Sequence, residues 1–296
     1  MLRAWVWTSG KMSWKSTLYA DSGTVRNVPT HAPRRALVTG GASGFGLAIA
    51  QALLAHGSQV AIGDLSAKSL GEAERALHGC NTLFLELDVT SAASVGEAVR
   101  SCQQRFGGLD TLLNSAGVIR FAPLAEISEA EWDLVIDVNL KGAFLCSQAA
   151  SPLLRTSGRG RIISIGSDAS KIGCPMIVPY CASKAGLVGL TKALAAELAP
   201  NDVTVNCVCP VGVSGTRMGQ EVLSWKTRAS GKRPEEILAA TAKAIPLKRN
   251  ATVPDVVNVV MFLLADSSAF LTGLALDVDG GALSAVPLPG VEASDS

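Results

Sequence analysis

Strand-length apolar runs alternate with stretches of helical periodicity along most of this 296-residue chain. The alternation predicts strands over residues 36–39, 59–63, 82–88, 111–114, 161–164, 204–208 and 274–278. Between them it predicts helices over residues 44–56, 68–77, 93–106, 129–154, 180–198 and 254–264. Strands that alternate with helices in this way typically form a parallel sheet with helices on both of its faces. The sequence therefore predicts an α/β fold with a doubly wound, parallel, seven-stranded sheet in a single domain.

The ends of the chain differ from this pattern. Residues 1–34 have no clear periodicity, and residues 285–296 are small, polar and proline-containing. We therefore expect an unstructured or poorly ordered N-terminal extension over 1–34, a folded domain over 35–284 and a flexible tail over 285–296.

The net charge of +1 is the sum of two unlike parts. Residues 1–35 hold six basic residues and one acidic residue, which makes that segment +5 and leaves −4 for the other 261 residues. A mildly acidic body lacks the basic face that neutralises phosphates, so no nucleic-acid partner is expected.

No run of 18 apolar residues occurs, and the N-terminus lacks the continuous apolar core of a secretory signal. We expect a cytoplasmic protein that does not enter a membrane. Import into an organelle through residues 1–34 stays open, because that segment is basic and rich in serine.

The seven cysteines follow no disulfide or zinc spacing, and the chain has three histidines. We expect buried free thiols in a reducing compartment and no metal site.

A glycine-rich turn follows the first predicted strand. The segment TGGASGFG contains Gly40, Gly44 and Gly46 and opens a helix. Glycines let a backbone approach a pyrophosphate, and a helix N-terminus supplies free N–H groups for it. The turn therefore predicts a Rossmann-like dinucleotide site.

Asp64 ends the second predicted strand, 18 residues after Gly46. An acid about 20 residues beyond the turn is placed to bind the ribose 2′-hydroxyl. The same carboxylate would repel a 2′-phosphate, and no lysine or arginine stands in the turn or at Leu65 and Ser66. The expected cofactor is therefore NAD rather than NADP.

Tyr180 and Lys184 stand four residues apart in the segment YCASK, one turn apart on a predicted helix. A nearby ammonium favours the phenolate, so such a tyrosine can exchange a proton with a hydroxyl group. Ser167 follows the fifth predicted strand and is placed to hold a substrate oxygen near Tyr180. Ser164 is the competing serine, and strand alternation favours Ser167.

The TGxxxGxG and YxxxK motifs make residues 35–281 similar to the short-chain dehydrogenase/reductase family. The resemblance implies catalysis by Asn139, Ser167, Tyr180 and Lys184. It also extends the predicted cofactor site, which comprises Gly40, Ser43, Gly44, Phe45, Gly46, Asp64, Leu65, Asp88, Val89, Asn114, Ala116, Gly117, Tyr180, Lys184, Pro210, Val213 and Thr216.

The resemblance further implies an NAD-dependent oxidoreductase that interconverts a secondary alcohol and a ketone, with Tyr180 as general acid and base. Family members are often tetramers, so a homo-oligomer is expected. Residues 217–249 should face a small-molecule substrate. Their apolar and basic residues leave open a reductase of 3-oxoacyl thioesters, on acyl carrier protein or coenzyme A.

Two other classes of protein compete with this prediction. A non-catalytic nucleotide-binding or scaffold subunit stays open, although Ser167, Tyr180 and Lys184 are all present. A Ser-His-Asp hydrolase is excluded, because no histidine occurs after His78.

Overall fold

The computed structural model describes residues 4–8, 11–15, 32–77 and 79–284. The chain divides into two compact units, Met1–Thr30 and His31–Ser296. In the first unit β1 (Ala4–Thr8) and β2 (Lys11–Lys15) pair antiparallel, although we expected this extension to be unstructured or poorly ordered. The predicted tail 285–296 lies outside the described residues.

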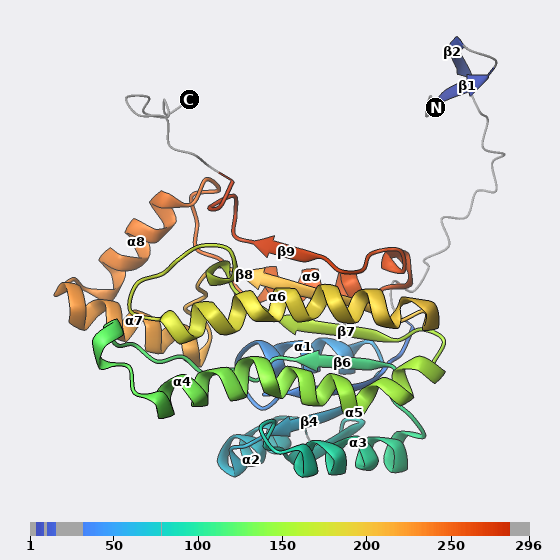
Figure 1. Cartoon of the computed structure of the whole chain (residues 1–296), viewed down its shortest axis with the longest axis horizontal. Coiled ribbons are helices and arrows are strands. Elements are labelled where there is room, and N and C mark those ends of the chain that lie inside the picture. Colours follow the sequence, from blue (N-terminus) through green and yellow to red (C-terminus); the bar gives the residue numbers. More distant parts are fainter. Residues whose placement is uncertain (1–3, 9–10, 16–31, 78, 285–296) are drawn as a thin grey trace. The chain divides into compact units, whose positions relative to one another are not determined.

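The second unit contains the predicted seven-stranded sheet, and every adjacent pair in it is parallel (Figure 1). In spatial order its strands are β5 (Thr82–Glu86), β4 (Gln59–Asp64), β3 (Arg35–Thr39), β6 (Thr111–Asn114), β7 (Arg161–Ile165), β8 (Thr204–Pro210) and β9 (Ala275–Val278). The chain first winds from β3 toward β5 and then returns to add β6 on the other side of β3. Ligands of such sheets bind at the carboxyl ends of the strands beside this reversal.

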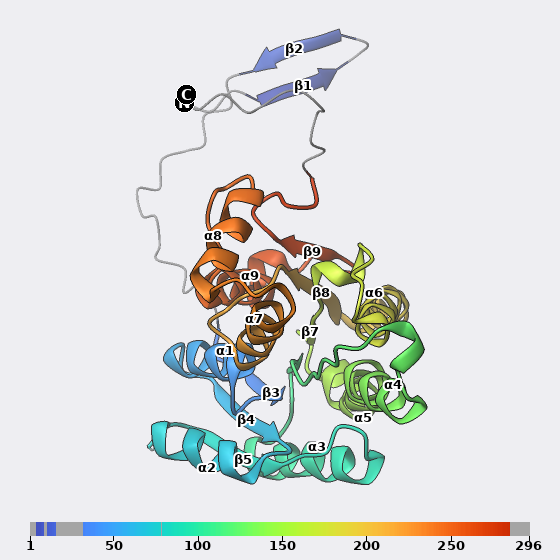
Figure 2. The ribbon, with the colours of Figure 1, turned by 90° about the vertical axis from the view of Figure 1, so that its left-hand side faces the viewer.

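Helices cover both faces of the sheet (Figure 2). Those described are α1 (Gly44–Ala55), α2 (Ala67–Ala76), α3 (Ala92–Phe106), α4 (Glu129–Ile136), α5 (Gly142–Thr156), α6 (Val178–Leu198), α7 (Arg217–Ser230), α8 (Pro234–Ala244) and α9 (Val253–Leu264). One apolar core joins the sheet to α1, α2 and α9, and the other joins it to α3, α5 and α6. The predicted doubly wound fold is confirmed.

The helix predicted over residues 129–154 is interrupted. It begins at α4 with a capping box of Ser128 and Glu131, as the sequence indicates, but Asp137–Lys141 form a π-helical turn before α5 begins. A Cβ on Gly142 would lie 2.8 Å from Val89, so the helix passes close to the loop that follows β5. The interruption places Asn139 inside the π turn.

The cysteines are free, but they are not all buried. Cys80 is exposed at the turn before β5, and Cys174 and Cys181 are partly exposed near the carboxyl edge of the sheet. The prediction of buried thiols is therefore wrong for these three. Among the described residues, no group of three or more potential ligands is arranged for a metal ion, and no helix is long and apolar enough to cross a membrane.

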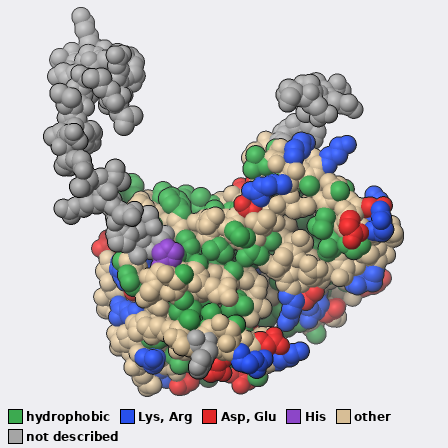
Figure 3. All heavy atoms as spheres, turned by 180° about the vertical axis from the view of Figure 1, so that it is seen from behind, with side chains coloured by type: hydrophobic (Ala, Val, Ile, Leu, Met, Phe, Trp, Pro, Cys, Tyr) green, Lys and Arg blue, Asp and Glu red, His purple; other side chains and the backbone are tan. Residues whose placement is uncertain are grey.

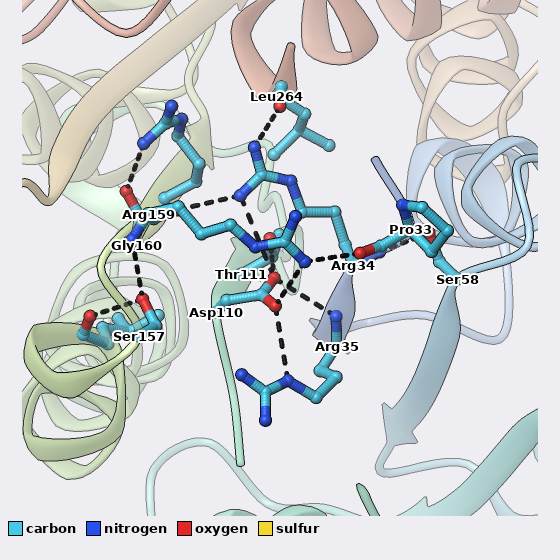
Figure 4. A network of polar contacts seen from close by, with 12 residues as sticks. Pro33, Arg34, Arg35, Ser58, Asp110, Thr111, Ser157, Arg159, Gly160 and Leu264 are labelled. Atoms are coloured by element: carbon cyan, nitrogen blue, oxygen red, sulfur yellow. Dashed lines mark hydrogen bonds and ion pairs between the residues drawn. The ribbon is translucent and has the colours of Figure 1, made fainter. Parts of the chain in front are cut away.

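A buried carboxylate organises the amino ends of the central strands (Figure 4). The Asp110 side chain is fully buried, and its Oδ2 lies 3.1 Å from Arg159 Nη2 and 3.4 Å from Arg35 Nε. Arg34 Nη1 lies 4.0 Å from Asp110 Oδ1, and Arg34 Nη2 donates to the carbonyl of Leu264 at 2.6 Å. Burial lowers the pKa of Arg34 to about 10. One aspartate thus faces three guanidinium groups.

We predict that Asp110→Asn lowers the free energy of unfolding by about 3–5 kcal/mol, because it leaves buried positive charge without its counter-ion. Urea denaturation measures the effect. Asp266 also pairs with Arg34, but its side chain is 67% exposed. Asp266→Asn should therefore cost no more than about 1 kcal/mol. Equal losses in the two variants would contradict the assignment of Asp110 as the organising charge.

Candidate active site

The predicted catalytic side chains meet at the carboxyl edge of the sheet. Ser167 lies two residues beyond β7, Tyr180 and Lys184 lie in the first two turns of α6, and Asn139 lies in the π turn. All four are at most 8% exposed. The competing serine, Ser164, is still within β7, where it accepts a hydrogen bond from Asn114 at 3.3 Å.

Tyr180 lies between Ser167 and Lys184. Burial raises the pKa of Tyr180 above its ordinary value, and a hydrogen bond with Ser167 opposes that rise. Lys184 Nζ lies 5.6 Å from the centre of the Tyr180 ring. The sequence predicts that this ammonium lowers the tyrosine pKa, but the net shift is upward because burial dominates it. The phenol is therefore protonated at neutral pH.

Lys184 is held by the strand beside it. Its Nζ donates to the carbonyl of Ile165 at the end of β7, at 2.7 Å. Burial lowers the pKa of Lys184 to about 8. This ammonium is therefore charged at neutral pH, yet close to the point at which it gives up a proton.

Asn139 connects the π turn to the loop after β6. Its Oδ1 accepts from the Val118 amide at 2.8 Å, and its Nδ2 donates to the Val118 carbonyl and to Ser183 Oγ, both at 3.0 Å. Ser183 in turn donates to the carbonyl of Tyr180 at 2.8 Å. The sequence analysis did not single out Ser183, although it lies within the segment YCASK.

A small cavity lies next to this group. Its volume of about 10 Å³ suits one water molecule, and Asn114, Asn139 and Lys184 line part of it. Asn114 Oδ1 is buried there with no hydrogen-bond partner among the described residues. The cavity thus presents polar atoms from β6, the π turn and α6.

The glycine turn has the form that a dinucleotide requires. Gly40 has φ +60°, and a Cβ on it would lie 2.7 Å from the Ala116 backbone. A Cβ on Gly46 would lie 2.3 Å from the Gly40 carbonyl oxygen. Ser43 makes no side-chain cap, so the first N–H groups of α1, which include those of Gly44 and Phe45, are left to bind an anion. These features fit a pyrophosphate.

Two acids lie at the ends of neighbouring strands, Asp64 as the last residue of β4 and Asp88 two residues beyond β5. Asp64 accepts from the amides of Ala42 at 3.2 Å and Ser66 at 3.0 Å, so it also holds the glycine turn in place. Leu65 beside it is 67% exposed. Asp88 lies next to Val89 and accepts from the amide of Thr90 at 2.9 Å.

The loop after β6 continues the site toward Lys184. Thr39 Oγ1 accepts from the amides of Ser115 at 3.2 Å and Ala116 at 3.3 Å, a role that the sequence analysis missed. A Cβ on Gly117 would lie 3.8 Å from Lys184 Nζ. The loop backbone at Gly117 thus lies close to Lys184.

The segment after β8 returns to the glycine turn. Pro210 ends β8 and Val213 is buried. Thr216 caps α7, accepting from the Gly219 amide at 3.0 Å. A Cβ on Gly44 would lie 3.7 Å from Thr216 Cβ. The structure thus brings the predicted cofactor residues of β3, β4, β5, β6 and β8 to one edge of the sheet.

The opposite wall of the site is apolar. Tyr180 Oη donates weakly to Met218 Sδ at 3.9 Å, and the rings of Phe121 and Trp225 stack with centroids 4.8 Å apart. These contacts were not predicted, because they join α7 to α6 and to the loop after β6, which are distant from it in the sequence. Of residues 217–249 we expected only that they face the substrate, and the amphipathic pattern of 217–230 was the available signal for α7.

Comparison with known proteins agrees with this geometry. Residues 40–282 match the family model described as enoyl-(acyl carrier protein) reductase. The chain is 38% identical over 247 residues to 2-(S)-hydroxypropyl-CoM dehydrogenase 3 of Xanthobacter autotrophicus, covering 82% of this chain and 94% of that protein. It is 36% identical over 251 residues to a 3-oxoacyl-[acyl-carrier-protein] reductase of Staphylococcus aureus, and the match covers 84% of this chain and 97% of that protein.

Among solved structures, a single-residue variant of actinorhodin polyketide ketoreductase with NADPH is similar, with a TM-score of 0.80 and 32% identity. The match covers 85% of this chain and 99% of that chain. The fold, the two motifs and these relatives agree over the same residues. The chain therefore belongs to the short-chain dehydrogenase/reductase family and is an oxidoreductase that uses a nicotinamide dinucleotide.

Proposed function

We propose that the protein is an NAD-dependent oxidoreductase that interconverts a secondary alcohol and a ketone, with Tyr180 as general acid and base. The observation that carries the proposal is the convergence of Ser167 and Lys184 on one buried tyrosine at the carboxyl edge of the sheet. The same convergence argues against a non-catalytic scaffold, which needs no such arrangement.

Residues of the chain bind the reacting oxygen of the substrate and transfer its proton. Bound in the site, the nicotinamide dinucleotide supplies or accepts the hydride. During oxidation Tyr180 takes the proton of the alcohol, and Ser167 steadies the oxygen as it becomes a carbonyl. During reduction Tyr180 returns the proton. Burial opposes the phenolate that this transfer needs. The Lys184 ammonium, 5.6 Å from the centre of the Tyr180 ring, is the nearby positive charge that favours it.

The proton then needs a path out of the site. With a pKa of about 8, Lys184 can release a proton near neutral pH and take one back. The water-sized cavity beside Lys184 and Asn139 extends the path toward Asn114. Asn139 acts as a positioning residue here, since its side-chain amide is used to hold Val118 and Ser183.

Asp64 supports the preference for NAD over NADP. Each of its carboxylate oxygens accepts one amide hydrogen bond and so keeps a lone pair for a ribose hydroxyl. A 2′-phosphate would meet this negative charge. The structure of the actinorhodin ketoreductase contains NADPH. For this chain we propose NAD instead, because of Asp64.

The second candidate, a 3-oxoacyl-thioester reductase, is favoured by the Staphylococcus aureus relative and by the basic residues of 217–249. That segment holds eight basic and three acidic residues. Arg217, Arg233 and Arg249, however, pair with Glu221, Glu236 and Asp255. The pairing leaves fewer free charges for an acidic carrier, so we prefer a small alcohol or ketone.

We also propose that the protein is a homo-oligomer. Phe262 of α9 is 48% exposed, and Phe270 and Leu274 beyond it are 100% and 37% exposed. Hydrophobic side chains gather in patches on the face turned away from the viewer of Figure 1, as Figure 3 shows. A second copy of the chain is the occupant that would remove such patches from water.

We predict that Tyr180→Phe lowers turnover by about 10²–10⁴-fold while the dinucleotide still binds, because only the proton donor is lost. Absorbance of the reduced cofactor measures turnover over a panel of alcohols and ketones, and fluorescence titration measures binding. The matched control is Tyr19→Phe, which changes the chain's other tyrosine. Turnover near the unaltered rate in Tyr180→Phe would contradict the proposed mechanism.

We predict that the unaltered protein prefers NAD over NADP by at least about 10-fold in kcat/KM, and that Asp64→Asn reduces the preference about 10-fold by removing the repulsive charge. Asp202→Asn is the control, since Asp202 is exposed at the opposite, amino edge of the sheet before β8. An unaltered protein that prefers NADPH, with an acyl thioester as its substrate, would favour the second candidate.

A further inference from the structure

We infer that Lys171 and Asp277 form a clamp that holds Ser167 in position for the reaction. Both residues act through the turn that begins at Ser167, so they are positioning residues rather than catalytic ones. The inference rests on the proposed function and adds to it the means by which the serine hydroxyl is held. It is carried by the contacts that join this turn to β9, the strand at one edge of the sheet.

Ser167 begins a short 3₁₀ turn, Asp168–Ser170, and its hydroxyl is part of that turn. Ser167 Oγ accepts from the Ala169 amide at 3.2 Å and donates to Asp168 Oδ1 at 2.8 Å. The Ser167 amide donates to Ser170 Oγ at 3.3 Å, and the Ser170 amide donates to the Ser167 carbonyl at 3.0 Å. The orientation of the serine hydroxyl therefore depends on the shape of the turn.

Lys171 follows the turn directly and ties it to β9. Its amide donates to the carbonyl of Asp168 at 2.9 Å. Its Nζ lies 2.6 Å from Asp277 Oδ1 and 2.8 Å from Asp277 Oδ2, and it also donates to the carbonyl of Ala275 at 2.9 Å. The side chains of Lys171 and Asp277 are 32% and 33% exposed, so water screens this pair only in part. One ammonium group thus binds three oxygens of the edge strand.

The two ends of the turn are held differently. On the entry side, the Gly166 amide donates to the Val208 carbonyl of β8 at 2.7 Å, and a Cβ on Gly166 would lie 2.7 Å from Cys207 Sγ. On the exit side the loop opens, because Ile172 is 45% exposed and a Cβ on Gly173 would meet no atom within 4 Å outside its immediate neighbours. The clamp therefore supplies at the exit the attachment to the sheet that β8 supplies at the entry.

Loss of the clamp should affect the reaction rather than the binding of the dinucleotide. The glycine turn and Asp64 belong to β3, α1 and β4, and β6, β7 and β8 separate these strands from β9 in the sheet. A displacement of a reacting group by about 1 Å is enough to slow catalysis strongly. We therefore expect kcat to fall in a protein that still binds its cofactor.

The test is a double-mutant cycle between the clamp and the serine. Lys171→Met and Asp277→Asn should each lower kcat about 10-fold, and together no more than either alone, because they break the same contact. In a Ser167→Ala background no hydroxyl is left to position, so Lys171→Met should cost less than about 2-fold there. Turnover of one alcohol is measured at high enzyme concentration, which keeps the slow serine variant measurable, and fluorescence titration should give an unaltered dinucleotide affinity.

Two further variants serve as controls. Lys171→Arg keeps a cation opposite Asp277 and should retain most of the unaltered kcat. Arg155→Met breaks an ion pair of similar exposure, since the Arg155 side chain is 37% exposed and pairs with Glu197 near the carboxyl ends of α5 and α6. This variant should leave kcat as it is.

The other outcomes are distinct. An equal loss of kcat with and without the Ser167 hydroxyl would show that the pair only supports the fold, and that result overturns the inference. A loss in Lys171→Arg as large as in Lys171→Met overturns it too, as does an unchanged kcat in Lys171→Met, while the proposed function stands. An unaltered protein that turns over no alcohol or ketone with either dinucleotide contradicts the proposed function and this inference with it.

Discussion

The hydrogen bond from Lys184 Nζ to the carbonyl of Ile165 joins α6 to the end of β7. Ser167 lies two residues beyond Ile165, and Tyr180 lies one helical turn before Lys184. This contact between a helix and a strand therefore helps to bring the serine and the tyrosine to the same edge of the sheet. The loop after β6 also borders Lys184, since its backbone at Gly117 lies close to the ammonium.

The fold and most of the site were predictable from local pattern. Predicted strand ends lie within two residues of the observed ones, because buried parallel strands are short apolar runs bounded by polar residues. The glycine turn was recognisable because Gly40 and Gly46 stand where any Cβ would meet backbone atoms. Tyr180 and Lys184 were recognisable because a spacing of four on a helix places both on one face.

The rest depends on contacts between segments distant in sequence. The π turn at Asn139 bonds to Val118, and the stack of Phe121 on Trp225 joins the loop after β6 to α7. The hydrophobic periodicity of one segment does not indicate which distant segment it will contact. The large effect of burial on Tyr180 was missed for the same reason, since it needs the positions of α4, α7 and the loop after β7 together.

The most direct test of the account asks whether Tyr180 and Lys184 act as one unit. Turnover of Tyr180→Phe, Lys184→Met and the double variant is measured on one alcohol with saturating dinucleotide. The account predicts that the double variant loses no more than the worse single variant, because either change disables the same proton transfer. A double variant that loses the product of the two single losses would contradict it.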